Sequence, residues 1–211
     1  MLDRLRIVDL SVPLEDGAVS EPMPARIQYV RHDGQGLEQM ERFFGVKPED
    51  LVYSEGRGWA IEEVQAITHT GTHVDAPFHY GPQSEGRPAR TIDEVPLEWC
   101  LAPGVVLDMR HKQPGDFIEV ADLQAALAQI EYHLKPLDIV LLQTGADQRI
   151  DSTAYFAQPG LGRDGTLWLV EQGVKVIGID AYTIDRPFLF LITDDKTGAI
   201  LFAGRISDPR S

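Results

Sequence analysis

Apolar segments of two different periods alternate through the second half of the chain. Three short runs rich in Val, Ile and Leu have the length of buried strands: Val105–Asp108, Ile139–Leu142 and Val174–Ile179. Between them lie two segments with helical apolar spacing, Ala121–Ile130 and Leu167–Gln172, and Gly173 closes the second. The order strand, helix, strand, helix, strand requires right-handed crossovers. It therefore predicts an α/β fold with a largely parallel sheet.

The first half of the chain predicts shorter elements. Leu5–Leu10 and Ile27–Val30 have the composition of extended segments, and Leu37–Phe44 predicts a helix closed by Gly45. We expect these strands to be antiparallel and to extend the parallel sheet into a mixed one. The Pro and Gly residues are scattered between the runs, and no segment is repeated. At 211 residues and 43% hydrophobic composition, the chain predicts a single domain over residues 1–211.

The charge of the chain excludes two classes of partner. Nineteen Lys and Arg residues against 33 Asp and Glu residues give a formal charge of −14, which repels phosphate backbones and anionic lipids. No apolar run reaches the roughly 18–20 residues of a membrane span, and the N-terminus lacks the apolar core of a signal peptide. Cys100 is the single cysteine, so no internal disulfide can form. We expect a cytoplasmic protein with neither nucleic-acid nor membrane partners.

Three histidines and one aspartate gather within eleven residues: His69, His73, Asp75 and His79. Their even spacing places all four on one face of an extended segment, whereas a helix would turn Asp75 away from His69. Gly71 and Pro77 also argue against a helix. A straight strand would hold the backbones of His69 and His73 about 13 Å apart, too far to share a metal. We therefore expect the chain to bend at Gly71.

The residue types in this cluster indicate metal chemistry. Two imidazoles and a carboxylate, with coordination positions left open, form the ligand set of a hydrolytic Zn²⁺ or Mn²⁺ site. His79 then remains to move protons. A purely structural role would bury several polar groups without partners, which costs free energy.

The pattern His-x-Gly-Thr-His-x-Asp-x-Pro-x-His resembles the signature of the metal-dependent cyclase family, which includes bacterial kynurenine formamidase and isatin hydrolase. All seven signature positions match: His69, Gly71, Thr72, His73, Asp75, Pro77 and His79. The resemblance runs from Leu10 to about Phe188. It implies a swivelling β/β/α-type fold, a homo-oligomer and hydrolysis of a small amide, lactam or lactone.

The resemblance also implies roles for individual residues. His69, His73 and Asp75 would be ligands of a first metal, Asp75 would bridge to a second metal in members that have two, and His79 would be the acid/base. The C-terminal segment departs from the family. Relatives with two metals carry a further His and a Glu near the chain end, but here Leu201 stands at the expected His position. The acidic residues that could substitute are Asp194 and Asp195, and the number of metals stays open.

The leading hypothesis is a metal-dependent hydrolase acting on a C–N bond of a small amide, with arylformamidase favoured by the resemblance. One alternative is a non-catalytic metal-binding relic of the family that lacks the second metal site. Another is an Fe(II) oxygenase, because two His and one carboxylate also describe a facial triad. The glycines of Gly160–Gly165 fit a dinucleotide fingerprint, but no strand precedes them and we expect a loop. Asp180 could line a pocket or cap a turn.

Overall fold

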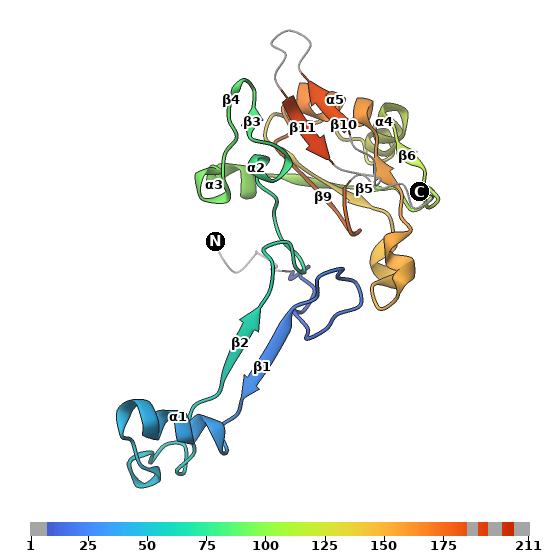
Figure 1. The fold of residues 1–211 in the computed structure, drawn as a ribbon. Coiled ribbons are helices and arrows are strands. Elements are labelled where there is room, and N and C mark those ends of the chain that lie inside the picture. The colour runs from blue at the N-terminus through green and yellow to red at the C-terminus, as the bar shows by residue number, and fades with distance from the viewer. Residues whose placement is uncertain (1–7, 185–189, 194–199, 205–211) are drawn as a thin grey trace, which may run out of the picture. The chain divides into compact units, whose positions relative to one another are not determined.

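The computed structural model describes residues 8–184, 190–193 and 200–204 (Figure 1). The chain divides into two compact units, Met1–His73 and Val74–Ser211. The single domain over residues 1–211 stays a prediction. Of the expected extended segment Leu5–Leu10, residues 5–7 lie outside the described residues, and Val8–Leu10 is not a strand.

A three-stranded parallel sheet forms the centre of the second unit. Its strands are β5 (Gly104–Asp108), β7 (Ile139–Gln143) and β9 (Val176–Ile179), in the order β5-β7-β9. Helix α4 (Val120–Gln129) connects β5 to β7, and α5 (Arg163–Glu171) precedes β9. The predicted alternation of strands and helices is confirmed, and with it the α/β class. Helix α5 begins four residues before the expected start at Leu167.

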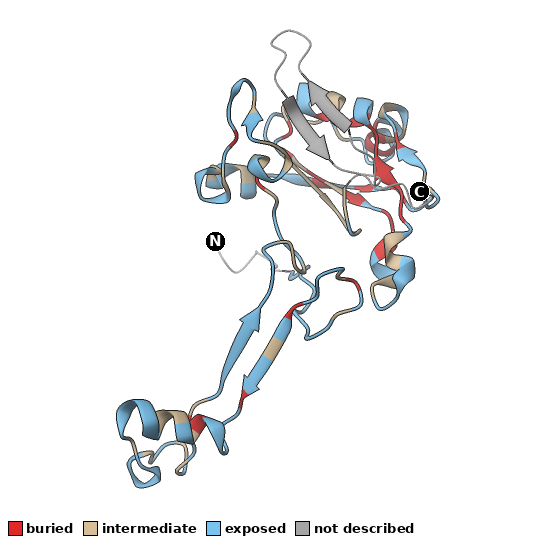
Figure 2. Cartoon of the chain, in the orientation of Figure 1, coloured by how far each residue is buried: buried red, intermediate tan, exposed pale blue. Residues whose placement is uncertain are grey.

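The core of this unit lies on one face of the sheet. Along β5 the side chains of Val105 and Leu107 are buried while Val106 is 54% exposed, the alternation of a strand covered on one side. Leu123 of α4 and Leu169 of α5 are fully buried in the same cluster. Figure 2 colours the buried residues of the chain red. The two crossover helices thus supply the cover for the sheet.

The remaining described strands of this unit pair in twos. Strands β6 (Phe117–Ile118) and β8 (Gly160–Leu161) are parallel; β3 (Gln83–Ser84) with β4 (Arg87–Pro88), and β10 (Phe190–Thr193) with β11 (Ile200–Gly204), are antiparallel. Helices α2 (Pro77–Tyr80) and α3 (Leu97–Cys100) are single turns, and the 3₁₀ turns are η3 (Ile92–Glu94), η4 (Ala146–Arg149) and η5 (Thr153–Phe156). The expectation that the antiparallel strands of the first half join the parallel sheet is wrong, because they form separate two-stranded sheets.

The first unit contains an antiparallel hairpin of β1 (Arg26–Val30) and β2 (Ile61–Gln65), and between them α1 (Gln35–Phe44) and the turn η2 (Pro48–Asp50). Gly45 ends α1 in the left-handed conformation at φ 65°, as predicted. Every residue of β2 is exposed. No helix in the part of the chain that the structure describes has the length and apolarity to span a membrane.

The glycine-rich segment Gly160–Gly165 is a strand and a helix start, so the expectation of a loop is wrong. Strand β8 opens it, Gly162 is the N-cap of α5, and Gly165 is buried in the first turn. A Cβ on Gly165 would lie 2.9 Å from the carbonyl oxygen of Ile118 and 3.1 Å from Leu161 Cδ1. This glycine is required by close packing of α5 on the chain beside it.

Replacing Gly165 with alanine is therefore expected to lower the free energy of unfolding by about 1–3 kcal/mol, the usual cost of overpacking. Helix propensity alone would predict the opposite change, because alanine is favoured over glycine in a helix by about 1 kcal/mol. Urea unfolding followed by circular dichroism measures it, with Glu171→Ala at the exposed end of α5 as the control. An unchanged midpoint for Gly165→Ala would contradict the packing argument.

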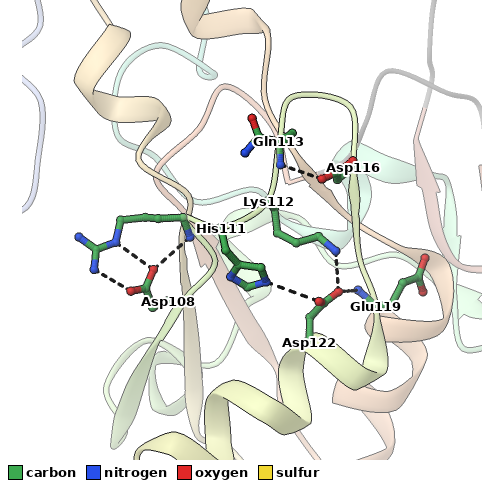
Figure 3. A network of polar contacts seen from close by, with 8 residues as sticks. Asp108, His111, Lys112, Gln113, Asp116, Glu119 and Asp122 are labelled. Carbon is green, nitrogen blue, oxygen red and sulfur yellow. Dashed lines mark hydrogen bonds and ion pairs between the residues drawn. The ribbon is translucent and has the colours of Figure 1, made fainter.

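Asp122 holds the start of α4 (Figure 3). Its carboxylate accepts hydrogen bonds from the Glu119 backbone N–H and from Lys112 Nζ, both at 2.8 Å, and His111 Nε2 lies 3.6 Å away. Partial burial raises the pKa of Asp122, but the bonds from Lys112 and Glu119 lower it by more, so its pKa lies below the ordinary value. The charged carboxylate therefore stabilises the fold.

Since the pKa of Asp122 is lowered in the folded protein, its contribution is fully present above the unfolded value of about 3.9. It is lost as the pH falls through the lower folded pKa. We expect Asp122→Asn to cost about 1 kcal/mol at pH 7, the usual value of a helix cap, and to flatten the loss of stability below about pH 4. Thermal unfolding between pH 7 and pH 3 measures both, with the exposed Asp164→Asn of α5 as control. Parallel pH curves for wild type and Asp122→Asn would refute this role.

Candidate metal centre

The histidine cluster begins at a sharp bend after β2. Gly71 adopts φ 65°, and its backbone N–H donates to Glu21 Oε1 at 2.9 Å. The next residue accepts a hydrogen bond at Thr72 Oγ1 from the backbone of Val12 at 3.0 Å. The predicted bend at Gly71 is confirmed, and side-chain hydrogen bonds fix it on both sides.

The bend brings the first two histidines together. His69 Nδ1 lies 3.3 Å from His73 Nε2, and the two rings meet edge to face with centroids 5.1 Å apart. His73 Nδ1 lies 2.7 Å from the carbonyl oxygen of Gly71, which can only accept, so Nδ1 carries the proton and Nε2 offers a lone pair. Two nitrogens bound to one tetrahedral Zn²⁺ at about 2.0–2.1 Å stand about 3.4 Å apart. The separation of the two rings therefore fits a shared cation.

A single helical turn places the last histidine. Pro77 is the first residue of α2, the position at which its fixed φ and missing N–H are favourable, and His79 follows two residues later. The expectation of an extended segment through His79 is wrong for this reason. Even so, one ligand atom each of His69, Asp75 and His79 lies within 4.8 Å of the others. The structure thus brings His69, Asp75 and His79 together, and it places His73 beside His69. Imidazoles with a carboxylate form a donor set that fits a divalent metal.

Tyr80 is a site residue that the sequence reasoning missed. Its hydroxyl donates to Asp75 Oδ2 at 3.1 Å, and its ring packs edge to face on His79 with centroids 4.9 Å apart. A residue that holds a ligand carboxylate in place supports a metal site from outside the ligand set. The only signal in the sequence is its position directly after His79 on the turn that Pro77 starts.

Replacing Tyr80 with phenylalanine keeps the ring but removes the hydrogen bond to Asp75. We expect metal affinity to fall by about 10-fold, at the lower end of the range for such supporting residues. Competition with a chromophoric chelator measures the dissociation constant. Tyr29→Phe on the exposed hairpin is the matched control, and equal affinities for the two variants would show that Tyr80 does not orient Asp75.

Asp180 caps a turn at the carboxyl end of the parallel sheet. Its carboxylate accepts hydrogen bonds from Thr144 N at 2.7 Å, from Thr144 Oγ1 at 2.6 Å and from Gly145 N at 2.7 Å. These bonds tie the residue after β9 to the residues after β7. Of the two roles open from the sequence, the contacts favour the cap.

Two family models match the chain, and their matches overlap at residues 178–186. The model of the Cyclase family matches residues 8–186. A second model, that of the serpins, which are serine protease inhibitors, matches residues 178–209. The segment where the sequence departs from the cyclase pattern therefore resembles a different family.

Individual relatives are named for hydrolysis. Kynurenine formamidase from Bacillus thuringiensis (strain Al Hakam) is 26% identical over 146 residues, 65% of this chain and 63% of that protein. Kynurenine formamidase from Erythrobacter litoralis (strain HTCC2594) is 30% identical over 146 residues, 65% of this chain and 60% of that protein. The chain thus spans less than two thirds of the length of these curated relatives. Isatin hydrolase A from Ralstonia solanacearum has a similar fold, with a TM-score of 0.65 and 24% identity over 85% of this chain and 68% of that one.

Proposed function

Since the chain belongs to the Cyclase family, we propose that it is a metal-dependent hydrolase that cleaves the C–N bond of a small amide. The observation that carries the proposal is the 3.3 Å separation of His69 Nδ1 and His73 Nε2, which suits two ligands of one cation. The names of the relatives, kynurenine formamidase and isatin hydrolase, support an aromatic amide or lactam as substrate. An N-formyl arylamine is the favoured member of this class.

His69, His73 and Asp75 are the proposed metal ligands, and Zn²⁺ and Mn²⁺ are the ions that suit two imidazoles and one carboxylate. A bound divalent cation would polarise the scissile carbonyl and lower the pKa of a coordinated water. The protein's part is to hold these side chains in register, through the bend at Gly71 and the bond from Tyr80 to Asp75.

His79 is the proposed acid/base. Its ring offers a nitrogen within 4.8 Å of ligand atoms of His69 and Asp75, and its side chain is exposed, so it can exchange protons with solvent. From this position it would pass a proton to the departing amine. The non-catalytic relic is not favoured, because the relatives named above are hydrolases.

Association and location complete the proposal. The protein would act on a small molecule, as a homo-oligomer in the cytoplasm, without nucleic-acid or membrane partners. The fully exposed strand β2 supports self-association, since a two-stranded hairpin gains stability when it packs on another surface. The charge of −14 and the single cysteine support the rest.

Turnover with and without metal tests the proposed reaction. Protein purified without chelator is assayed with N-formylkynurenine and with isatin, then stripped with EDTA and reloaded with Zn²⁺ or Mn²⁺. We expect hydrolysis that EDTA abolishes and one of the two ions restores. If metal-loaded protein hydrolyses neither compound, a non-catalytic metal-binding relic of the family would be the better explanation.

A further inference from the structure

The bend at Gly71 is held by a loop from near the start of the chain. The backbone N–H of Gly71 donates to Glu21 Oε1 at 2.9 Å, across 50 positions of sequence. On the other side of the bend, the backbone N–H of Val12 donates to Thr72 Oγ1 at 3.0 Å. Val12 Cγ2 also lies 3.8 Å from the position that a Cβ on Gly71 would take. The segment that contains Val12 and Glu21 therefore contacts the bend between the first two histidines directly.

The loop that carries Glu21 is itself closed on strand β1. Gly17, at φ 70°, donates its backbone N–H to the carbonyl oxygen of Ala25 at 2.9 Å. Asp16 Oδ1 accepts a hydrogen bond from the backbone N–H of Ile27, in β1, at 2.8 Å. Ala25, directly before β1, is fully buried. These contacts fix the backbone on either side of Glu21, so its carboxylate is presented to the bend from a set position.

Gly71 connects Glu21 to a proposed metal ligand. The carbonyl oxygen of Gly71 accepts the hydrogen bond from His73 Nδ1 at 2.7 Å, and Nε2 of the same ring lies 3.3 Å from His69 Nδ1. Glycine has more backbone freedom than any other residue, so the direction of its carbonyl group depends on what holds its backbone. At Gly71 the N–H group is held by Glu21. The orientation of the His73 ring therefore depends on Glu21 through a single residue.

We propose that Glu21 is a positioning residue of the metal centre: its carboxylate holds the backbone of Gly71, and Gly71 in turn orients the ring of His73. This inference rests on the proposed function, and it adds a residue from outside the histidine-rich segment to those that the reaction needs. A hydrogen bond to an ionised carboxylate is about twice as strong as one between neutral groups. An acidic side chain is therefore well suited to hold a glycine backbone in one conformation.

Two substitutions at Glu21 test the hydrogen bond. Glu21→Gln keeps an oxygen that can accept from the Gly71 N–H, whereas Glu21→Met keeps a side chain of similar length but offers only a weak sulfur acceptor. Glu41→Met is the matched control, because it removes one carboxylate from an exposed position of α1 in the same unit. The control is needed because the chain has a formal charge of −14, and the loss of any acidic residue weakens the general attraction for a cation.

The affinity for Zn²⁺ is measured on the full-length protein by competition with a chromophoric chelator. We expect Glu21→Met to bind Zn²⁺ about 10-fold more weakly than wild type, at the lower end of the range for residues that support a metal site. Glu21→Gln should retain most of the affinity, and Glu41→Met should match wild type. Equal affinities for Glu21→Met and Glu41→Met would overturn the inference. So would a loss in Glu21→Gln as large as that in Glu21→Met.

A second measurement, on metal-free protein, reports on His73 itself. Long-range ¹H–¹⁵N spectra show which ring nitrogen carries the proton, and the hydrogen bond to a ring nitrogen sets this tautomer. We expect the Nδ1–H form of His73 in wild type and in Glu21→Gln, and a mixture of tautomers in Glu21→Met. An unchanged His73 signal in Glu21→Met would contradict the positioning role. If wild type binds no Zn²⁺, the proposed function fails, while these spectra still decide whether Glu21 orients His73.

Discussion

Replacing His73 with alanine is expected to remove the metal and, with it, turnover. The ring of His73 supplies one of two nitrogens that stand 3.3 Å apart, and the remaining donors cannot hold the cation at ordinary concentrations. Losing a residue that only supports a metal site costs about 10–100-fold in affinity, so losing a ligand should cost more than about 100-fold. Isothermal titration with Zn²⁺ and an assay of amide hydrolysis measure the two effects together.

The control for this variant is His133→Ala, since His133 is exposed and far along the chain from the cluster. It should bind metal and turn over substrate as wild type does. If His73→Ala instead retains stoichiometric metal with an unchanged dissociation constant, His73 is not a ligand. In that case the imidazole nitrogens of His69 and His79 and a carboxylate oxygen of Asp75 would form the coordinating set, because these ligand atoms lie within 4.8 Å of one another.

Replacing His79 with alanine is expected to separate chemistry from metal binding. Loss of a general acid or base slows a reaction by about 10²–10⁴-fold. The proposed ligands His69, His73 and Asp75 are unchanged in this variant, so metal content should remain at the wild-type value. Initial rates on N-formylkynurenine and metal analysis of the same sample test both parts.

The dependence of the rate on pH distinguishes an acid/base role of His79 from a structural role, which would not change that dependence. In wild type, an imidazole that transfers a proton should produce a limb in the dependence of kcat/KM on pH. We expect this limb to disappear in His79→Ala. Should the variant lose its metal along with its rate, His79 acts as a ligand, and a full rate would exclude both roles.

The sheet could be predicted from the sequence because its signals are local. The runs at Val105–Asp108 and Ile139–Leu142 carry enough β-branched and Leu residues to be recognised alone, and the helix between them has its own period. The bend at Gly71 was predictable for a similar reason, since metal-bond lengths set a distance that a straight strand exceeds.

The parts that could not be predicted depend on position or on distant partners. Pro77 argues against a helix anywhere except at the first turn, which is where α2 places it. The bond from Tyr80 to Asp75 follows from that turn, so it was missed together with it. The cap by Asp180 joins residues 36 positions apart, and no local pattern reports such a contact.

The sequence shows that the C-terminal segment departs from the cyclase pattern, but it does not show why. Leu201 stands where the cyclase pattern expects a histidine. The sequence alone does not distinguish an altered cyclase end from a segment that resembles another family. The serpin model matches residues 178–209, which include the whole hairpin of β10 and β11. Asp194 and Asp195, which the sequence offers as substitute ligands, lie outside the described residues.

The described core of the second unit is built from residues between Val105 and Val174, whereas the proposed metal-binding segment, residues 69–79, contributes only Ala76 to the buried residues. Substitutions in that segment can therefore change what the protein does without unfolding it. Harmful substitutions in the two regions would therefore have different effects. A substitution in the core would unfold the protein, whereas one in the histidine cluster would remove the proposed activity. If the proposed reaction were no longer needed, the histidines could change while the sheet persisted.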